Sequence, residues 1–180
     1  MKNHLITSSE VRTQRLLLRS IVEDDLEQLY LGLSDPDVIQ HYGVNYSSLE
    51  ETKAQLDFYT ELEKHNTGKW WAICDVLTNE FYGAIGLNDL KVEHKKAELG
   101  FWLLKEHWGK GYISEVFPEI CKFGFEKRKL HRIEAIVEQE NTNSKKCLIK
   151  NNFLLEGTMK ECEIKNGRYI SLEIYAKLNS

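Results

Sequence analysis

The segment from Trp108 to Ser114 has the residue types that could bind a phosphate group. Gly109 and Gly111 allow tight backbone turns that expose N–H groups, and an apolar helical pattern follows directly. The first N–H groups of a helix lack partners and carry a partial positive charge. This predicts a pyrophosphate cradle, although Gly-x-Gly before a helix is also typical of a plain tight turn. Neither G-x-G-x-x-G nor a P-loop is present, because Gly111 stands where a P-loop has Ser or Thr.

A second polar segment, Asn141 to Ser144, lies between a predicted strand and a short predicted helix. Asn and Ser are preferred residues at helix starts, so capping alone would account for them. Its combination with the glycine segment, rather than its own composition, favours a functional role.

No metal site is predicted. The six histidines, at positions 4, 41, 65, 94, 107 and 131, lack the spacing of metal ligands. The four cysteines form no C-x-x-C pair and lie in apolar runs, which favours buried free thiols over disulfides or metal ligands. These cysteines are Cys74, Cys121, Cys147 and Cys162.

The elements that position these segments follow from hydrophobic periodicity. The first third is predicted to contain a strand at 15–19, a helix around 26–33, a break with a new helix start at Asp35-Pro36, and a helix capped at Ser47 or Ser48. Three antiparallel strands are then predicted at 70–77, 81–90 and 96–104.

The second half is predicted to begin with a buried helix from about 111 to 127. A strand at 132–138, a short helix at 143–150 and two strands at 153–164 and 169–178 follow, and Asn166-Gly167 predicts a type I′ hairpin between the last two. The expected fold class is α/β (α+β), with a single mixed, mostly antiparallel sheet flanked by helices, in one domain over 1–180.

Composition excludes several classes of protein. The 180 residues are 42% hydrophobic and 29% charged, which is typical of a globular domain rather than a disordered or coiled-coil chain. No apolar stretch approaches the roughly 20 residues that span a bilayer, and the polar start Met1–His4 is unlike a signal peptide. We therefore expect a cytoplasmic protein with no membrane partner.

Charge is distributed unevenly around the net value of −4. Residues 1–90 contain 7 Lys and Arg against 15 Asp and Glu, whereas residues 91–180 contain 17 against 13. The asymmetry suggests that an anionic ligand meets the second half and a cationic one the first, or that two faces are simply solvated differently. No basic run is interleaved with aromatic residues, which argues against nucleic acid as a partner.

Motifs along most of the chain, from about Arg12 to Lys177, carry a family resemblance. They are Ala97–Leu103, Trp108–Ser114, Asn141–Ser144, Asn152–Gly157, Met159-Lys160, and Glu163 ahead of the Asn166-Gly167 turn. In this order they resemble the GCN5-related N-acetyltransferase (GNAT) superfamily. Within it, the likeness is to the RimJ/RimL group, which acetylates the N-terminal amine of ribosomal proteins.

The resemblance implies that acetyl-CoA is the cosubstrate and that no metal is needed. The backbone of Phe101, Trp102 and Leu103 would pair with the pantetheine arm, and the side chain of Asn141 would hydrogen-bond that arm. The loop and helix start would cradle the pyrophosphate. That cradle comprises Trp108, Gly109, Lys110, Gly111, Tyr112, Ile113 and Ser114.

Three positions depart from the superfamily pattern. Trp108 stands where Gln or Arg is usual, and Ile113 stands where Gly or Ala is usual, although RimL-like sequences accept Ile there. Leu148 occupies the place at which many members have a Tyr that protonates the leaving thiolate. A mechanism that depends on this Tyr is therefore excluded at that position.

The RimL-like pattern instead assigns the general acid to Ser144 and the general base to Glu163, acting through a water. Glu98 is a rival base, because strand alternation places it with Gly100 and Trp102 on the face that would contact the acyl arm. The expected activity is direct attack of an amine on acetyl-CoA in a ternary complex.

The sequence defines the chemistry of acetyl transfer better than it defines the acceptor. A protein N-terminus is the acceptor that the resemblance implies, and a polyamine or amino acid is the alternative within the same chemistry. A non-catalytic acyl-CoA sensor is a third alternative, against which the presence of Ser144 and Glu163 argues. The chain is expected to be a monomer or a homodimer.

Overall fold

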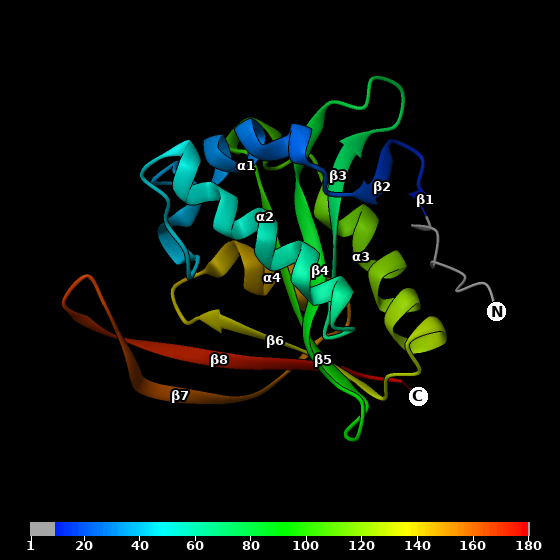
Figure 1. The fold of residues 1–180 in the computed structure, drawn as a ribbon. Helices are drawn as coiled ribbons and strands as arrows, with labels where there is room; N and C mark the ends of the chain where they lie inside the picture. Colours follow the sequence, from blue (N-terminus) through cyan, green and yellow to red (C-terminus); the bar gives the residue numbers. More distant parts are fainter. Residues whose placement is uncertain (1–9, 180) are drawn as a thin grey trace.

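The computed structural model describes residues 10–179 (Figure 1). Residues 1–9 and 180 lie outside the described residues, and they include the polar start Met1–His4. Between residues 10 and 179, no helix combines the length and the apolar character needed to cross a membrane.

One eight-stranded sheet with the order β1-β2-β3-β4-β5-β6-β8-β7 forms the centre of the molecule. Every neighbouring pair is antiparallel except β5 with β6, which is parallel. The predicted mixed, mostly antiparallel sheet flanked by helices is confirmed. The strands are β1 (Val11–Arg12), β2 (Leu16–Ser20), β3 (Lys69–Asp75), β4 (Phe81–Lys91), β5 (Lys96–Leu103), β6 (Arg132–Glu138), β7 (Leu154–Lys165) and β8 (Arg168–Leu178).

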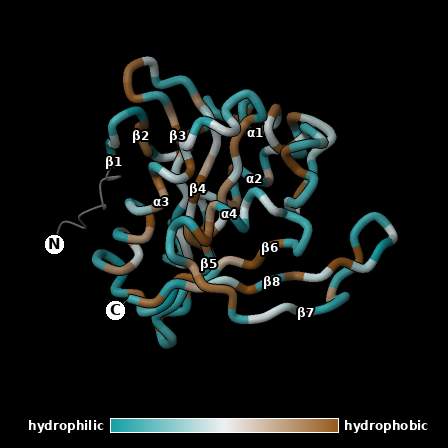
Figure 2. The backbone as a smooth tube through the Cα atoms, turned by 180° about the vertical axis from the view of Figure 1, so that it is seen from behind, coloured by the Kyte–Doolittle hydropathy of each residue, from teal (hydrophilic) through white to brown (hydrophobic). Residues whose placement is uncertain are grey.

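Helices cover both faces of the sheet. On one face α1 (Leu26–Leu33) and α2 (Leu49–Lys64) bury Leu29, Leu33, Tyr59 and Leu62 against Trp70 and Trp102. On the other face α3 (Tyr112–Lys122) and α4 (Thr142–Lys150) bury Val116, Phe117, Ile120 and Leu148 against Trp71 and Ile85. Because strand side chains alternate, Trp70 and Trp71 enter opposite cores, and Figure 2 shows apolar stretches along these central strands.

Several local details differ from the sequence prediction. The Asp35-Pro36 break leads to a turn and a short 3₁₀ helix, Ile39–His41, rather than to an α-helix. The buried helix ends as α3 at Lys122 and continues as one π-helical segment, Phe123–Lys127. Strand β1 was not predicted, because two residues carry no periodic signal.

The expectation of four buried cysteines is wrong at two positions. Cys74 and Cys121 are buried, whereas Cys147 is half-buried and Cys162 is exposed, and all four are free thiols. Cys162 lies in β7, the edge strand of the sheet, where most side chains are exposed. An apolar run in an edge strand is therefore weaker support for burial than one in a central strand.

Candidate active site

The sheet opens between β5 and β6. These strands pair only from Lys96–Arg132 to Glu98–Glu134. Beyond Glu98, β5 continues along β4 and β6 continues along β8, so in the described chain neither has a strand partner on the inner side. Figure 1 shows β6, β8 and β7 fanning away from β3 and β4. The inner edge of β5 therefore offers backbone hydrogen-bonding groups to a ligand.

A cavity of about 700 Å³ lies at this opening. Its volume is within the range of small-molecule and cofactor sites. The wall combines the end of β5, the glycine loop, the start of α3, the start of α4 and the loop around Ile39–His41. The lining residues are 37–38, 40–42, 101–103, 107–109, 111–114, 140–144, 146–147 and 150.

The glycine loop has the geometry of an anion cradle. Gly109 and Gly111 have φ values of 72° and 79°, a region that residues with a Cβ rarely adopt. Gly111 is the N-cap of α3, and no side chain among residues 10–179 caps this helix. The first-turn N–H groups at Tyr112, Ile113 and Ser114 therefore remain as donors beside the cavity.

Trp108 also has a role that its place in the sequence motif did not suggest. Its indole Nε1 donates a hydrogen bond of 2.9 Å to the carbonyl of Leu103. The bond ties the glycine loop to the end of β5, so the departure from Gln or Arg at this position closes the loop rather than simply removing a polar group.

Ser144 lies in the first turn of α4 and lines the cavity. The Oδ1 atom of Asn141 caps this helix by accepting from the Ser144 N–H at 3.1 Å, which is the capping role that the sequence allowed. Lys145 fixes the same turn to the sheet, because its Nζ donates to Glu173 on β8 at 3.2 Å and to the Gln139 carbonyl at 2.8 Å. Leu148 is fully buried in the core.

The two candidate bases lie in different surroundings. Glu163 is exposed on β7 and does not line the cavity. Glu98 is half-buried on β5, where burial, and then the charges of Asp89 and Glu134, raise the pKa of its carboxyl. Glu98 is outside the cavity lining as well.

A polar cluster at the cavity rim was missed by sequence reasoning. His41 Nδ1 lies 2.7 Å from Glu138 Oε2, and Lys165 Nζ lies 2.5 Å from Glu138 Oε1. Burial acts to raise the pKa of Glu138, but the hydrogen bonds with His41 and Lys165 lower it overall. These three residues come from distant parts of the chain, so no local pattern could have shown the cluster.

The structure brings most of the sequence-predicted site residues together around one cavity, and the exceptions are Lys110, Glu163 and the rival base Glu98. Those that line it are Phe101, Trp102, Leu103, Trp108, Gly109, Gly111, Tyr112, Ile113, Ser114, Asn141 and Ser144. In residues 10–179 no group of three or more His, Cys, Asp or Glu side chains is placed to hold a metal ion.

These features fit a nucleotide-linked thioester such as acetyl-CoA. The helix start offers donors for phosphate oxygens, the inner edge of β5 offers backbone groups for an amide-containing arm, and the cavity joins the two. Lys146 and Lys150 are the lysines in the cavity lining.

Comparisons with known proteins identify the family of this chain. The model of the acetyltransferase (GNAT) domain family matches residues 15–154. The chain is 32% identical over 167 residues to the uncharacterized N-acetyltransferase YoaA of Bacillus subtilis (strain 168). This match covers 92% of this chain and 94% of the relative. It is 25% identical over 170 residues to the ribosomal-protein-serine acetyltransferase of Escherichia coli (strain K12), with coverage of 92% and 94%.

A solved structure of RimL, a ribosomal alpha-N-protein acetyltransferase in complex with coenzyme A, superposes with a TM-score of 0.85. The two chains are 25% identical, and the superposition covers 94% of this chain and 98% of the other. The RimL-like resemblance of the sequence is thus confirmed. The chain belongs to the GNAT acetyltransferase family, and it is an N-acetyltransferase that uses acetyl-CoA.

Proposed function

We propose that the acceptor is the N-terminal amine of a protein, such as a ribosomal protein, and that acetyl transfer is direct within a ternary complex. The observation that carries this proposal is the meeting of three features in one cavity: the inner edge of β5, the uncapped start of α3, and Ser144. The acceptor class is supported by the Escherichia coli relative and by the RimL structure.

In this proposal the protein contributes positioning and electrostatics. Bound acetyl-CoA supplies the thioester from which the acetyl group is transferred. The first-turn N–H groups of α3 hold the pyrophosphate, and the Phe101–Leu103 backbone aligns the pantetheine arm. A backbone N–H of this strand segment stabilises the negative charge that develops on the carbonyl oxygen during attack.

The acceptor amine must lose a proton to become a nucleophile. An α-amino group has a pKa of about 7.7–8.0, so much of it is protonated at neutral pH. Glu163 takes this proton through a water in our proposal. Its side chain is on the same face of β7 as that of Lys165, which reaches the cavity rim at Glu138.

Glu98 remains the alternative base. Its raised pKa makes its carboxylate a stronger proton acceptor once ionised. Its charge also acts on the cavity residue Tyr42, whose pKa is raised by burial first, then by neighbouring tyrosines, and then by Glu98.

Ser144 is proposed to serve the leaving group. Its backbone is fixed by the Asn141 cap, and the residue belongs to the cavity lining. A hydroxyl at this place can donate a hydrogen bond or a proton to the thiolate as the carbon–sulfur bond breaks.

A panel of acceptors tests the proposed function. Purified protein with acetyl-CoA would be mixed with serine-starting peptides, the same peptides with a blocked N-terminus, spermidine, or free amino acids, and release of the thiol would be followed. We expect release with the free peptides and none with the blocked ones. Release with spermidine alone would move the assignment to a small amine, and binding of coenzyme A without release for any amine would favour a sensor.

A further inference from the structure

The glycine loop lies on the surface of the molecule. Residues 108–111 are all exposed, although their conformation must be fixed if their N–H groups are to meet a pyrophosphate. The hydrogen bond from the Trp108 indole to the Leu103 carbonyl fixes only the first residue of the loop, so contacts at its two ends are needed as well. Those ends are His107, the last residue of the 3₁₀ segment Lys105–His107, and Tyr112, the first residue of α3.

Both ends stack on one aromatic ring, that of Tyr82 in β4. The centroid of His107 lies 3.9 Å from that of Tyr82 with an interplanar angle of 27°, and the centroid of Tyr112 lies 4.9 Å away with an angle of 19°. The centroids of His107 and Tyr112 are 6.2 Å apart, so Tyr82 bridges them. Tyr82 is buried, which restricts its ring, and its hydroxyl donates to Asp75 Oδ2 at 3.1 Å.

Arg15 makes a second set of contacts with the loop. Its Cζ atom lies 4.7 Å from the centroid of Tyr112, and its Nη1 donates to the carbonyl of Lys110 at 3.0 Å. Its Nε forms an ion pair of 2.7 Å with Glu115 Oε2 in the first turn of α3. A single side chain thus joins the loop backbone to the helix that supplies the phosphate donors.

We propose that Tyr82 and Arg15 are positioning residues that hold the 108–111 loop in its pyrophosphate-binding conformation. Neither lines the cavity, so each acts through the loop rather than by touching the ligand. Tyr82 sets the separation of the loop ends by aromatic stacking, and Arg15 sets the orientation of the Lys110–Gly111 peptide. The proposal rests on the use of acetyl-CoA, and it is independent of which amine is acetylated.

The test compares two acetyl donors and two pairs of variants. Tyr82→Leu removes the ring, and Tyr82→Phe keeps the ring but loses the bond to Asp75. Arg15→Ala removes the loop contacts, and Arg12→Ala is the matched control, because Arg12 is an exposed arginine paired only with Glu10 among its described ion pairs. The donors are acetyl-CoA and S-acetylpantetheine, which lacks the pyrophosphate.

We expect Tyr82→Leu and Arg15→Ala to raise the KM for acetyl-CoA about tenfold, with kcat at saturation and the KM for S-acetylpantetheine within twofold of wild type. Tyr82→Phe and Arg12→Ala should stay within twofold for both donors. Equal losses with both donors would show a general structural role and overturn the proposal, as would an unchanged KM for acetyl-CoA in Arg15→Ala.

Calorimetric titration with coenzyme A separates this proposal from the proposed acceptor. It needs no amine, so a tenfold weaker affinity in Arg15→Ala with wild-type affinity in Arg12→Ala supports the loop assignment even if the peptide acceptors fail. Equal affinities in these two variants would contradict it. Arg15 is partly exposed, with a side chain 45% accessible, so its replacement leaves the core intact.

Discussion

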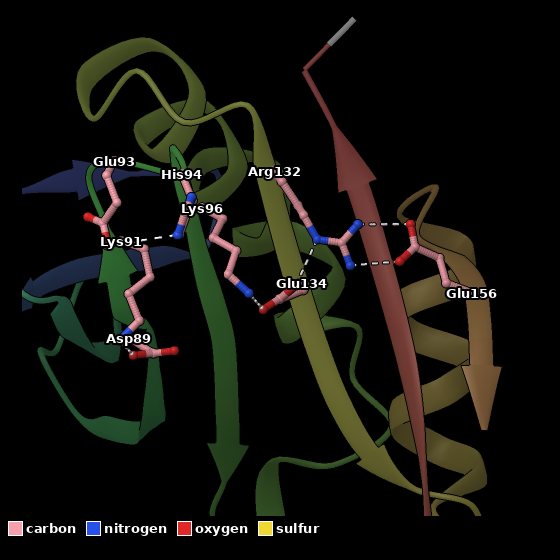
Figure 3. Close-up of polar contacts among 8 residues, drawn as sticks. All are labelled: Asp89, Lys91, Glu93, His94, Lys96, Arg132, Glu134 and Glu156. Atoms are coloured by element: carbon pink, nitrogen blue, oxygen red, sulfur yellow. Dashed lines mark hydrogen bonds and ion pairs between the residues drawn. The ribbon is translucent and has the colours of Figure 1, made fainter. Parts of the chain in front are cut away.

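The two ends of the β5–β6 pair are built in opposite ways. At the paired end, Lys96 and Arg132 converge on Glu134 at 2.6 and 2.7 Å, and Arg132 reaches across β8 to Glu156 on β7 (Figure 3). At the other end the strands separate and the cavity begins. At the paired end the polar side chains bind one another, whereas at the open end backbone donors remain available to a ligand.

This difference predicts that stability and activity depend on separate parts of the molecule. Burial acts to raise the pKa of Glu134, but hydrogen bonds from Lys96 and Arg132 lower it overall, so the ionised form is favoured by folding. At the open end, by contrast, no described side chain caps α3, and the loop is exposed. Variants at the open end should therefore change turnover, and variants at the paired end should change the free energy of unfolding.

The largest expected effect on turnover is that of Glu163→Gln. General base catalysis typically contributes about 10²–10⁴-fold, so kcat at neutral pH should decrease by a factor in that range. The affinity for acetyl-CoA should be retained. Because alkaline pH supplies free amine without a base, the defect should shrink as the assay pH rises.

The same pH series with Glu98→Gln decides between the two bases. A Glu163→Gln defect that stays constant from neutral to alkaline pH, together with a Glu98→Gln defect that shrinks, would transfer the role to Glu98 and move the chemistry closer to the paired end of β5.

Ser144→Ala should have the next largest effect on turnover. Loss of leaving-group stabilisation should lower kcat by about 10²-fold and leave coenzyme A affinity within twofold, because the Asn141 cap uses the backbone N–H and not the hydroxyl. Steady-state kinetics and calorimetry on the same preparation measure both quantities. A loss of affinity equal to the loss of kcat would show that Ser144 serves binding instead.

Gly111→Val should weaken coenzyme A binding by about tenfold. The φ of 79° suits glycine, and a β-branched residue there costs at least about 1–2 kcal/mol or forces the loop to rearrange. Gly157→Val in β7 is the matched control, since no atom lies within 4 Å of a Cβ added there and its φ is not positive. Equal affinities for the two variants in calorimetry would remove the cradle from the binding site.

The smallest effect on turnover is expected for Glu134→Gln at the paired end. Unfolding at neutral pH should require about 1–3 kcal/mol less free energy, while kcat and KM stay within twofold. Because folding lowers the pKa of Glu134, its contribution is present above the unfolded value near 4.5 and is lost as the pH falls through the folded value. Urea titrations should therefore show the wild-type advantage at pH 7 and its loss in acid; an advantage independent of pH would contradict the ionic origin.

Local patterns in the sequence predicted the elements well where neighbouring residues decide the conformation. The strand at 132–138 has the predicted bounds, and the Asn166-Gly167 turn has positive φ at both residues, as a type I′ turn requires. The glycine loop and the start of α4 were located from residue types alone. Each of these features depends on backbone preferences that act over a few residues.

Features that depend on tertiary pairing could not be predicted. The separation of β5 from β6 could not be read from either strand. Alternation in β5 does give way to the apolar run Phe101–Leu103, but such a run is equally typical of a fully buried strand. The stacking of His107 and Tyr112 on Tyr82 joins residues that are 25 and 30 positions apart. The exposure of Glu163 and Cys162 follows from the position of β7 at the sheet edge, which is a property of the topology.

The hairpin of β7 and β8 has a consequence for how the range of acceptors could evolve. Lys165 near its tip donates to the backbone carbonyls of Gln40 and Tyr42, both in the cavity wall, and such bonds do not depend on the side chains at those positions. A two-residue insertion in each strand would displace this anchor by roughly 7 Å and carry the wall with it. We expect a change in the length of β7 and β8, which do not line the cavity, to change which amines fit. Acceptor preference could then diverge among descendants while every residue that lines the cavity stays the same.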